Sequence, residues 1–239
     1  MYTINRRVSP SQTDEQGCLK FVSALDMMQD CSLFWEESEP LMAQYFQQNG
    51  IAQFLMTRQV DVLRVPNFRE ELSVATGIYD AKPHMGCRNT VIYDAQGLPC
   101  FTCWGVGAYV NKEKQKIVRI PREVLEGFTI DEKVDMEYAN PKIFVPQTTE
   151  PLAYAPVPVR KQDIDINGHM NNSRYIELLY ELLPEGFQVA RMRVEYRLAA
   201  QYGNVLHPFC YANAEGTTFT LTLCAPTGDI HILAEFTGR

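Results

Sequence analysis

The chain has 239 residues, of which 46% are hydrophobic and 21% charged, and its formal net charge is -7. This length allows one large domain or two small domains with real hydrophobic cores, and the acidic balance argues against nucleic acid as the main partner. No apolar run approaches the ~18 residues of a membrane span, and the start MYTINRR lacks the apolar stretch of a signal peptide, so we expect a cytoplasmic protein with no membrane span.

The first part of the chain predicts two helices followed by strands. Apolar residues recur at helical spacing between Ser23 and Glu37, which predicts a buried helix with Ser23 and Asp26 as a capping box. A second, shorter helix is predicted to begin near Pro40 and to stop at Gly50. Four strand-like runs then cover residues 58–65, 72–81, 87–95 and 99–110.

The last of these strands contains Cys100 and Cys103, whose C-x-x-C spacing occurs in redox and zinc sites. At an odd separation on a strand the two thiols point to opposite faces, so one metal ion could not easily bind both. Seven cysteines at irregular spacing fit reduced thiols better than a disulfide framework. We therefore expect packing roles for these cysteines, with no metal and no cofactor.

The same order of elements recurs toward the end of the chain. Residues 171–183 predict a helix that ends at Pro184 and Gly186, and strand-like runs follow over residues 189–198, 205–214, 218–225 and 229–236. Aligning the two halves by their helix starts places Asp14–Cys18 against Asp165–His169, a shift of 151 residues. The first copy has a cysteine where the second has the histidine, so we expect chemistry in the second half only.

The segment between the two halves predicts a linker. Residues 129–151 have no clear periodicity and contain three prolines, which is typical of a segment that lies along the surface. We therefore divide the chain into an N-terminal domain of residues 1–128, a linker of residues 129–150 and a C-terminal domain of residues 151–239.

Three polar residues of different chemistry stand at every second position just before the helix of the second half. Asp165, Asn167 and His169 alternate with Ile164 and Ile166. In an extended backbone alternate residues share one face, so the polar side chains would line a cavity while the isoleucines anchor the other face.

This arrangement predicts a hydrolytic site. His169 could act as a general base toward water, because the unperturbed pKa of histidine, ~6.5, lies near neutral pH. The N–H groups of the first helical turn, capped by Asn171 or one of the next two residues, suit a carbonyl oxygen that gains negative charge. Asn167 could hold the water or the carbonyl, and Asp165 could orient the imidazole. The structural alternative is an Asx-type turn, with the histidine packed at the helix start.

Residues Asp163 to Ile176 read DIDINGHMNNSRYI, which resembles the D-x-D-x-N-x-H-x-N-N-x-x-Y-I segment of the acyl-acyl-carrier-protein (acyl-ACP) thioesterase family of plant plastids and bacteria. Weaker similarities, along most of the chain, are Val65-Pro66, Arg88 ahead of Ile92-Tyr93-Asp94, Trp104, and Val194-Glu195-Tyr196-Arg197. The resemblance implies an α+β fold of two tandem hotdog domains, each a curved antiparallel sheet wrapped around a long central helix.

The resemblance also implies an activity and a separate role for each domain. A member of this family hydrolyses the thioester of fatty acyl-ACP by attack of water and releases free fatty acid. The acyl chain would lie in the N-terminal domain, and Asp165, Asn167 and His169 would be the catalytic residues.

One departure from the family pattern bears on activity. Plant members carry Glu and Cys four and five residues after the Glu of the V/L-E-Y-R segment, where this chain has Ala199 and Ala200. A thiol nucleophile at that site is excluded. If a carboxylate must activate water, the protein is slow, uses Glu177 or Glu195, or no longer catalyses, and a polar helix stripe with Arg174 is a competing role for Glu177.

Two other functions stay open: an acyl-CoA thioesterase, because CoA is also anionic, and a non-catalytic acyl- or lipid-binding protein. Expected partners are acylated ACP and a second copy in a homodimer. Basic residues that could dock an acidic carrier are Lys112, Lys114, Lys116, Arg191, Arg193 and Arg197. Candidate walls of an acyl pocket, for which core packing is the competing role, are Met27, Met28, Phe34, Trp35 and Phe54.

Overall fold

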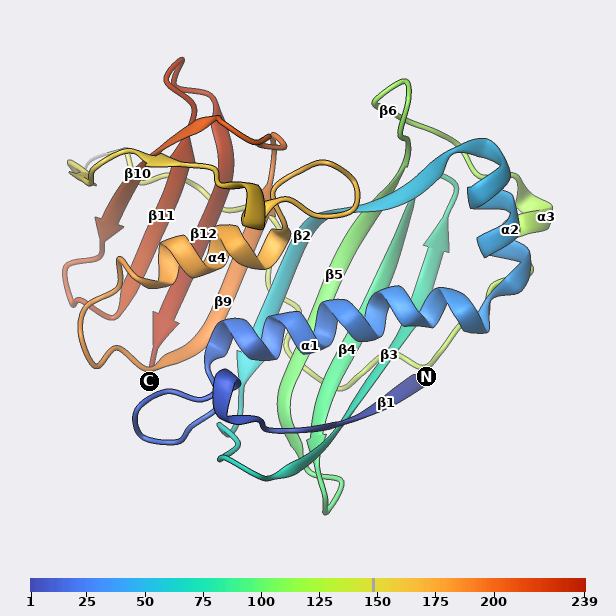
Figure 1. Cartoon of the computed structure of the whole chain (residues 1–239), viewed down its shortest axis with the longest axis horizontal. Helices are drawn as coiled ribbons and strands as arrows, with labels where there is room; N and C mark the ends of the chain where they lie inside the picture. Colours follow the sequence, from blue (N-terminus) through green and yellow to red (C-terminus); the bar gives the residue numbers. More distant parts are fainter. Residues whose placement is uncertain (148) are drawn as a thin grey trace. The chain divides into compact units, whose positions relative to one another are not determined.

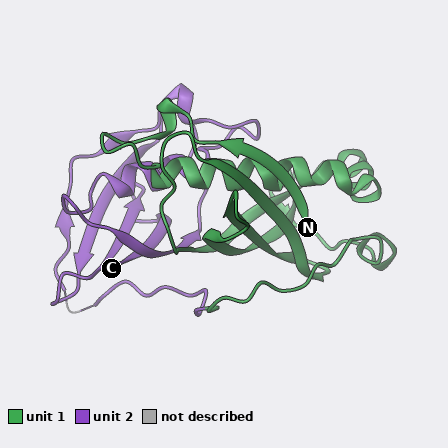
Figure 2. Cartoon of the chain, turned by 90° about the horizontal axis from the view of Figure 1, so that it is seen from below, with its two compact units in different colours: residues 1–138 green, residues 139–239 purple. Residues whose placement is uncertain are grey.

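The chain forms two compact units, Met1–Tyr138 (unit 1) and Ala139–Arg239 (unit 2), coloured separately in Figure 2. The structure is a computed structural model that describes residues 1–147 and 149–239, so residue 148 of the predicted linker lies outside the described part. The boundary between the units, after Tyr138, falls within that predicted linker. Within the described part, no helix is both long enough and apolar enough to cross a membrane.

Unit 1 is an antiparallel sheet with a helix packed across one face (Figure 1). Its strands lie in the order β1-β3-β4-β5-β2, and a short strand, β6, pairs with β5. The strands are β1 Tyr2–Arg7, β2 Ile51–Val62, β3 Glu71–Lys82, β4 Met85–Asp94, β5 Pro99–Asn111 and β6 Lys116–Ile117. The helical segments are η1 Pro10–Gln12, α1 Phe21–Phe34, η2 Trp35–Ser38, α2 Pro40–Asn49 and α3 Arg122–Leu125.

Helix α1 is the predicted buried helix. It begins at Phe21 with Lys20 as its N-cap, so the predicted capping box of Ser23 and Asp26 is wrong: both residues already lie inside the first turns. Its apolar side chains pack into unit 1, and the Cys31 thiol donates a hydrogen bond to a β3 carbonyl oxygen at 3.1 Å. The buried residues of α1 are Phe21, Ala24, Leu25, Met27, Met28 and Cys31.

Unit 2 repeats this plan with a shorter helix. Its strands lie in the order β9-β12-β11-β10-β7, with β8 paired to β10, and α4 crosses them (Figure 1). The elements are β7 Leu152–Ala153, β8 Val157–Pro158, η3 Lys161–Asp163, α4 Asn172–Tyr180, β9 Val189–Tyr196, β10 Val205–Ala212, β11 Thr218–Cys224 and β12 Ile230–Gly238. Each unit thus has the predicted antiparallel sheet and central helix.

The two cysteines of the C-x-x-C pair are packed within β5. Cys100 and Cys103 are both buried, and burial raises the pKa of Cys103 to about 11, so its thiol stays neutral. All seven cysteines are free. Within the described residues, no group of three or more His, Cys, Asp and Glu side chains is arranged to hold a metal ion.

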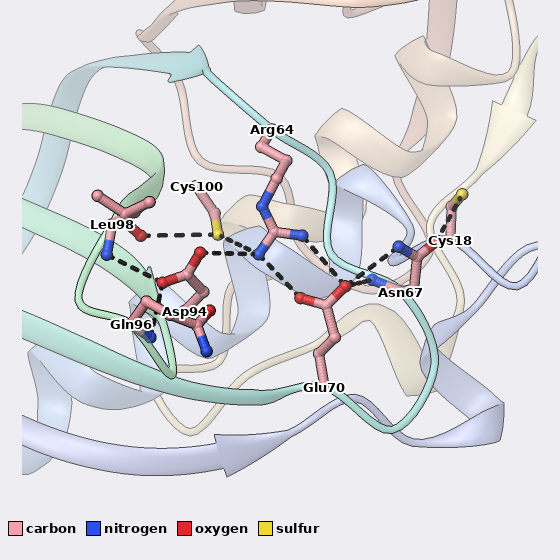
Figure 3. A network of polar contacts seen from close by, with 8 residues as sticks. All are labelled: Cys18, Arg64, Asn67, Glu70, Asp94, Gln96, Leu98 and Cys100. Carbon is pink, nitrogen blue, oxygen red and sulfur yellow. Dashed lines mark hydrogen bonds and ion pairs between the residues drawn. The ribbon is translucent and has the colours of Figure 1, made fainter.

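A network of hydrogen bonds around Arg64 connects three loops of unit 1 (Figure 3). Its guanidinium donates to the two carboxylate oxygens of Glu70 at 3.1 and 2.8 Å and to Oδ2 of Asp94, in the β4–β5 turn, at 3.2 Å. Glu70 Oε1 also accepts the backbone N–H of Asn67 at 2.8 Å, and the Cys18 thiol donates to the Asn67 amide oxygen at 3.7 Å. These bonds join the loop before α1, the loop after β2 and the β4–β5 turn.

We predict that Glu70→Gln lowers the free energy of unfolding at pH 7 by about 1 kcal/mol, because it weakens charge-assisted hydrogen bonds that water partly screens. The hydrogen bonds from Arg64 lower the pKa of Glu70 to about 2. The contribution of this carboxylate is therefore complete above its unfolded pKa of ~4.3 and is lost as the pH falls toward the folded value. Urea unfolding of parent and variant at pH 7 and pH 3 measures this, and a difference that does not shrink at pH 3 contradicts it.

Candidate active site

The segment from Asp165 to His169 is a tight turn, and the prediction of an extended segment is wrong. The N–H of Asp165 donates to the carbonyl of His169 at 2.8 Å, and the N–H of Gly168 donates to the carbonyl of Asp165 at 3.0 Å. Gly168 has a φ of 77°, in the left-handed region that favours glycine. Ile166 is 91% exposed at the tip, so it anchors no packed face.

The Asp165 side chain holds this turn. Its Oδ1 accepts the backbone N–H of Asn167 at 2.8 Å and the backbone N–H of His169 at 3.4 Å. This is the Asx-type turn that the sequence left open as a structural alternative. The carboxylate therefore sets the backbone path on which the other two polar residues lie.

The same turn occurs at the aligned position of unit 1. Asp14 accepts the N–H of Gly17 through its carbonyl at 3.1 Å and the N–H groups of Gln16 and Cys18 through Oδ1 at 2.9 and 2.8 Å. The N–H of Asp14 donates to the Cys18 carbonyl at 2.9 Å. The predicted alignment of the two halves, with its shift of 151 residues, is therefore confirmed at the level of individual hydrogen bonds.

A third copy of the turn joins β4 to β5. Asp94 accepts the N–H groups of Gln96 and Leu98 through Oδ1, both at 2.9 Å, and that of Gly97 through its carbonyl at 3.0 Å. Like the turn at Asp14, it contains no histidine. The D-x-x-G turn is thus a general structural element of this chain, and only its copy in unit 2 carries an imidazole.

Helix α4 begins directly after the turn. The Asn171 side chain is the N-cap, accepting the N–H and the hydroxyl of Ser173 at 2.9 and 3.0 Å, as the sequence predicted. His169 is partly exposed with its Nδ1 buried, and Asn167 is exposed. Asn167 and His169, two of the three residues predicted to be catalytic, therefore stand beside the N-terminal end of a helix, where backbone N–H groups favour negative charge.

Ala200, which follows the exposed Ala199 in the chain, lies against this site. The N–H of Met170, next to the histidine, donates to the Ala200 carbonyl at 2.8 Å, and the N–H of Ala200 donates to the Tyr175 hydroxyl at 2.7 Å. Burial raises the pKa of Tyr175 to about 12, so this hydroxyl stays protonated. The structure thus places Ala200 beside the predicted catalytic turn, at the position where plant family members have Cys.

The two carboxylates named as substitutes already have partners. Glu177 accepts a hydrogen bond from Arg174 at 2.9 Å, as expected for a polar helix stripe. Glu195 accepts hydrogen bonds from the backbone N–H of Ile143 and, at 3.0 Å, from Arg197. Glu177 also lines a cavity of about 380 Å³ together with Arg160, Gln162, Asp163 and Arg174.

The residues predicted to line an acyl pocket are separated in unit 1. Met27, Met28 and Trp35 are buried in its core, at most 2% exposed, whereas Phe34 is 42% exposed. Phe54, on β2, is partly buried. Met27, Met28 and Trp35 thus have the core positions that the competing interpretation predicted, and Phe34 does not.

The predicted docking residues fall into two sets. Lys112, Lys114 and Lys116 are exposed around the turn between β5 and β6. On β9, Arg191 is partly buried, and Arg193 pairs with Glu235 at 2.8 Å and donates to a backbone carbonyl. Arg197, just beyond this strand, pairs with Glu195 at 3.0 Å. The lysines offer more charge to a partner than the arginines.

Comparison with known proteins identifies the class. The family model for the acyl-ACP thioesterase N-terminal domain matches residues 1–128, and that for the C-terminal domain matches residues 147–236. The chain is a thioester hydrolase with an α+β fold of two tandem hotdog domains, as the sequence predicted. It belongs to the acyl-ACP thioesterase family.

Solved structures show the same fold. An acyl-ACP thioesterase from Bacteroides thetaiotaomicron has a TM-score of 0.88 at 21% identity, covering 99% of this chain and 97% of that one. A 12:0-ACP thioesterase from Umbellularia californica has a TM-score of 0.85 at 18% identity, covering 100% of this chain and 98% of that one. No curated protein sequence matches the chain.

We predict that Asp165→Asn keeps thioester hydrolysis within about 10-fold of the parent, whereas Asp165→Ala lowers kcat by ~10², because only the amide retains an oxygen acceptor for the turn. Steady-state hydrolysis of an acyl thioester measures both. Asp14→Ala, which removes the same acceptor in unit 1, is the matched control and should leave kcat unchanged. Equal, large losses in Asp165→Asn and Asp165→Ala would mean that the negative charge itself is required.

Proposed function

We propose that this protein hydrolyses the thioester of fatty acyl-ACP and releases free fatty acid, with Asn167 and His169 as catalytic residues and Asp165 as the residue that positions them. The observation that carries the proposal is the hydrogen-bonded turn that holds Asn167 and His169 immediately before α4, in the part of the chain that matches the C-terminal family model.

The chemistry follows from this geometry. With Nδ1 of His169 buried, Nε2 is the ring nitrogen that we assign to take a proton from the attacking water. The water oxygen bonds to the thioester carbon, and the carbonyl oxygen becomes negative beside the Asn167 amide and the N-terminal end of α4. When the C–S bond breaks, the imidazolium returns the proton to sulfur, which leaves a free acid and a thiol.

The alanines at positions 199 and 200 limit the groups that can take part in the proposed hydrolysis. No carboxylate or thiol side chain is present at these positions, so neither assists the water or forms an acyl intermediate there. The proposal therefore rests on direct attack of water with a single base, His169.

The carrier is proposed to dock through the exposed lysines at the β5–β6 turn. Carrier protein and CoA are both anionic, so an acyl-CoA thioesterase is the second candidate function. A carrier protein presents a large charged surface and should contact all three lysines. CoA is smaller and should depend less on them. The homodimer expected from the sequence stays a prediction.

We predict that His169→Ala and Asn167→Ala each lower kcat for acyl-ACP hydrolysis by ~10² or more with the fold intact, because each removes interactions made in the transition state. A panel of ACP and CoA thioesters of one chain length measures kcat and KM, and far-ultraviolet circular dichroism verifies the fold. His84→Ala, an exposed histidine of unit 1, is the matched control. Parent-like rates in His169→Ala contradict the proposed mechanism, and equal kcat/KM for the two carriers contradicts the preference for ACP.

We predict that Lys114→Glu raises KM for acyl-ACP by about 10-fold and weakens its dependence on ionic strength, because it reverses one docking charge. KM for the matching CoA thioester should change less. Lys20→Glu reverses an exposed lysine outside the docking turn and serves as the control. An unchanged KM for acyl-ACP in the Lys112, Lys114 and Lys116 reversal variants would show that docking occurs elsewhere.

A further inference from the structure

Two arginines flank a glycine on the inner face of the unit 1 sheet, which is the face that α1 and η2 cover. Arg58 on β2 and Arg88 on β4 are each directly opposite Gly105 on β5, one on either side. Neighbouring strands lie about 4.8 Å apart, so the two arginine Cα atoms are roughly 10 Å apart, with no side chain on the residue between them. Residues opposite each other on neighbouring strands share one face of the sheet, so both arginine side chains extend from the same face.

Arg88 faces α1 and η2. Its guanidinium carbon lies 4.1 Å from the centre of the Trp35 ring, and Nη1 donates to the Thr76 hydroxyl at 3.3 Å. Burial lowers the pKa of Arg88 to about 10, so the group is still charged at neutral pH. Two carboxylates, Glu36 and Glu39, lie close enough to favour the charged form of Arg88, and burial raises the pKa of Glu36.

Arg58 shares this face and has less support. Gln59 and Trp104 are the sequence neighbours of Arg58 and Gly105, and they hydrogen-bond to each other on the other face of the sheet. Because side chains alternate along a strand, Arg58 points to the face that carries Arg88. Arg58 is 7% exposed, and its side chain forms no hydrogen bond or ion pair with another described residue. Arg58 lies close enough to Cys103 to oppose the rise in the pKa of that thiol, but the thiol stays neutral and does not balance the charge of the guanidinium.

A further hydrogen-bond donor on this face lacks a partner. The Tyr109 hydroxyl is buried, has no hydrogen-bond partner among the described residues, and lies where a side chain on Gly86 would touch it. Buried charges and donors are normally paired, because leaving them unpaired destabilises the folded protein. The face thus carries two buried guanidinium groups together with a phenol hydroxyl that lacks a partner.

We propose that Arg58 and Arg88 bind the carboxylate of an aliphatic acid within unit 1. Guanidinium groups match carboxylates in charge and in bidentate geometry. The surroundings suit a hydrocarbon tail: the Leu55 side chain lies over Gly105, and Met27 and Met28 of α1 are buried in the same unit. The ligand is either a free fatty acid or an acyl chain that ends in a second carboxylate.

The site goes beyond the proposed hydrolysis and does not require it, because binding needs no turnover. If the ligand is the free acid, the site retains the product of the reaction in unit 1. Acid binding by a protein that cleaves no thioester would contradict the proposed function and leave this site intact.

Isothermal titration calorimetry with decanoate, 1-decanol and inorganic phosphate tests the proposal. We expect the parent to bind decanoate at least 10-fold more tightly than the alcohol, and Arg58→Gln to lose that preference. Arg58→Lys should keep part of it, and Arg122→Gln, a change at an exposed arginine, should keep all of it. Arg88→Gln is the second test variant if Arg58→Gln does not fold, as judged by thermal unfolding.

The outcomes separate the ligands. Decanoate that inhibits the parent but not Arg58→Gln supports a free acid, and faster hydrolysis of the ω-carboxydecanoyl than of the decanoyl thioester in the parent, but not in Arg58→Gln, supports a second carboxylate. Equal binding of acid and alcohol overturns the proposal. So does a preference for acid that persists in both glutamine variants, or binding of phosphate without any preference for the acid.

Discussion

The hydrogen bonds that Asp165 accepts from its own turn are the interaction on which the candidate active site depends. They bend residues 165 to 169 so that His169 stands next to the N-cap of α4, with Met170 tied to the Ala200 carbonyl. Without this turn, the imidazole, the Asn167 amide and the helix N-terminus would have no fixed relation to one another. Most of the proposed chemistry is therefore a matter of backbone geometry, enforced by one carboxylate and one glycine with a positive φ.

The two units show how a duplicated fold acquires a site in one copy. Both begin their central helix after the same D-x-x-G turn, but position 18 is a thiol and position 169 an imidazole. In unit 1 hydrogen bonds among Arg64, Glu70 and Asn67 hold the surrounding loops together, so that end of the unit has a structural role. In unit 2 the corresponding end has Ala200 beside the turn.

Much of the fold was predictable from the sequence because its strands alternate and its turns carry glycine. The runs over residues 72–81 and 218–225 correspond closely to β3 and β11, and the stop at Gly50 has the left-handed φ that the prediction needed. The start of α1 was missed because Lys20 caps that helix without a side-chain hydrogen bond, which leaves no signal in the sequence. The prediction of an extended segment at residues 165–169 was wrong because alternation of polar and apolar residues alone cannot distinguish a strand from an Asx turn. The repeated D-x-x-G pattern at Asp14, Asp94 and Asp165 was the available signal.

The pairing of charges could not be read from the sequence, because it depends on which strands become neighbours. Glu195 accepts a hydrogen bond from the backbone N–H of Ile143, and Arg193 pairs with Glu235 on β12, although nothing in the sequence spacing indicates these partners. The central claim, that the turn holds His169 and Asn167 against the substrate carbonyl, is tested most directly by a crystal structure with a non-hydrolysable acyl-pantetheine analogue. The account predicts the carbonyl mimic within about 3.5 Å of His169 Nε2 or the Asn167 amide. A carbonyl mimic bound away from both side chains would contradict it.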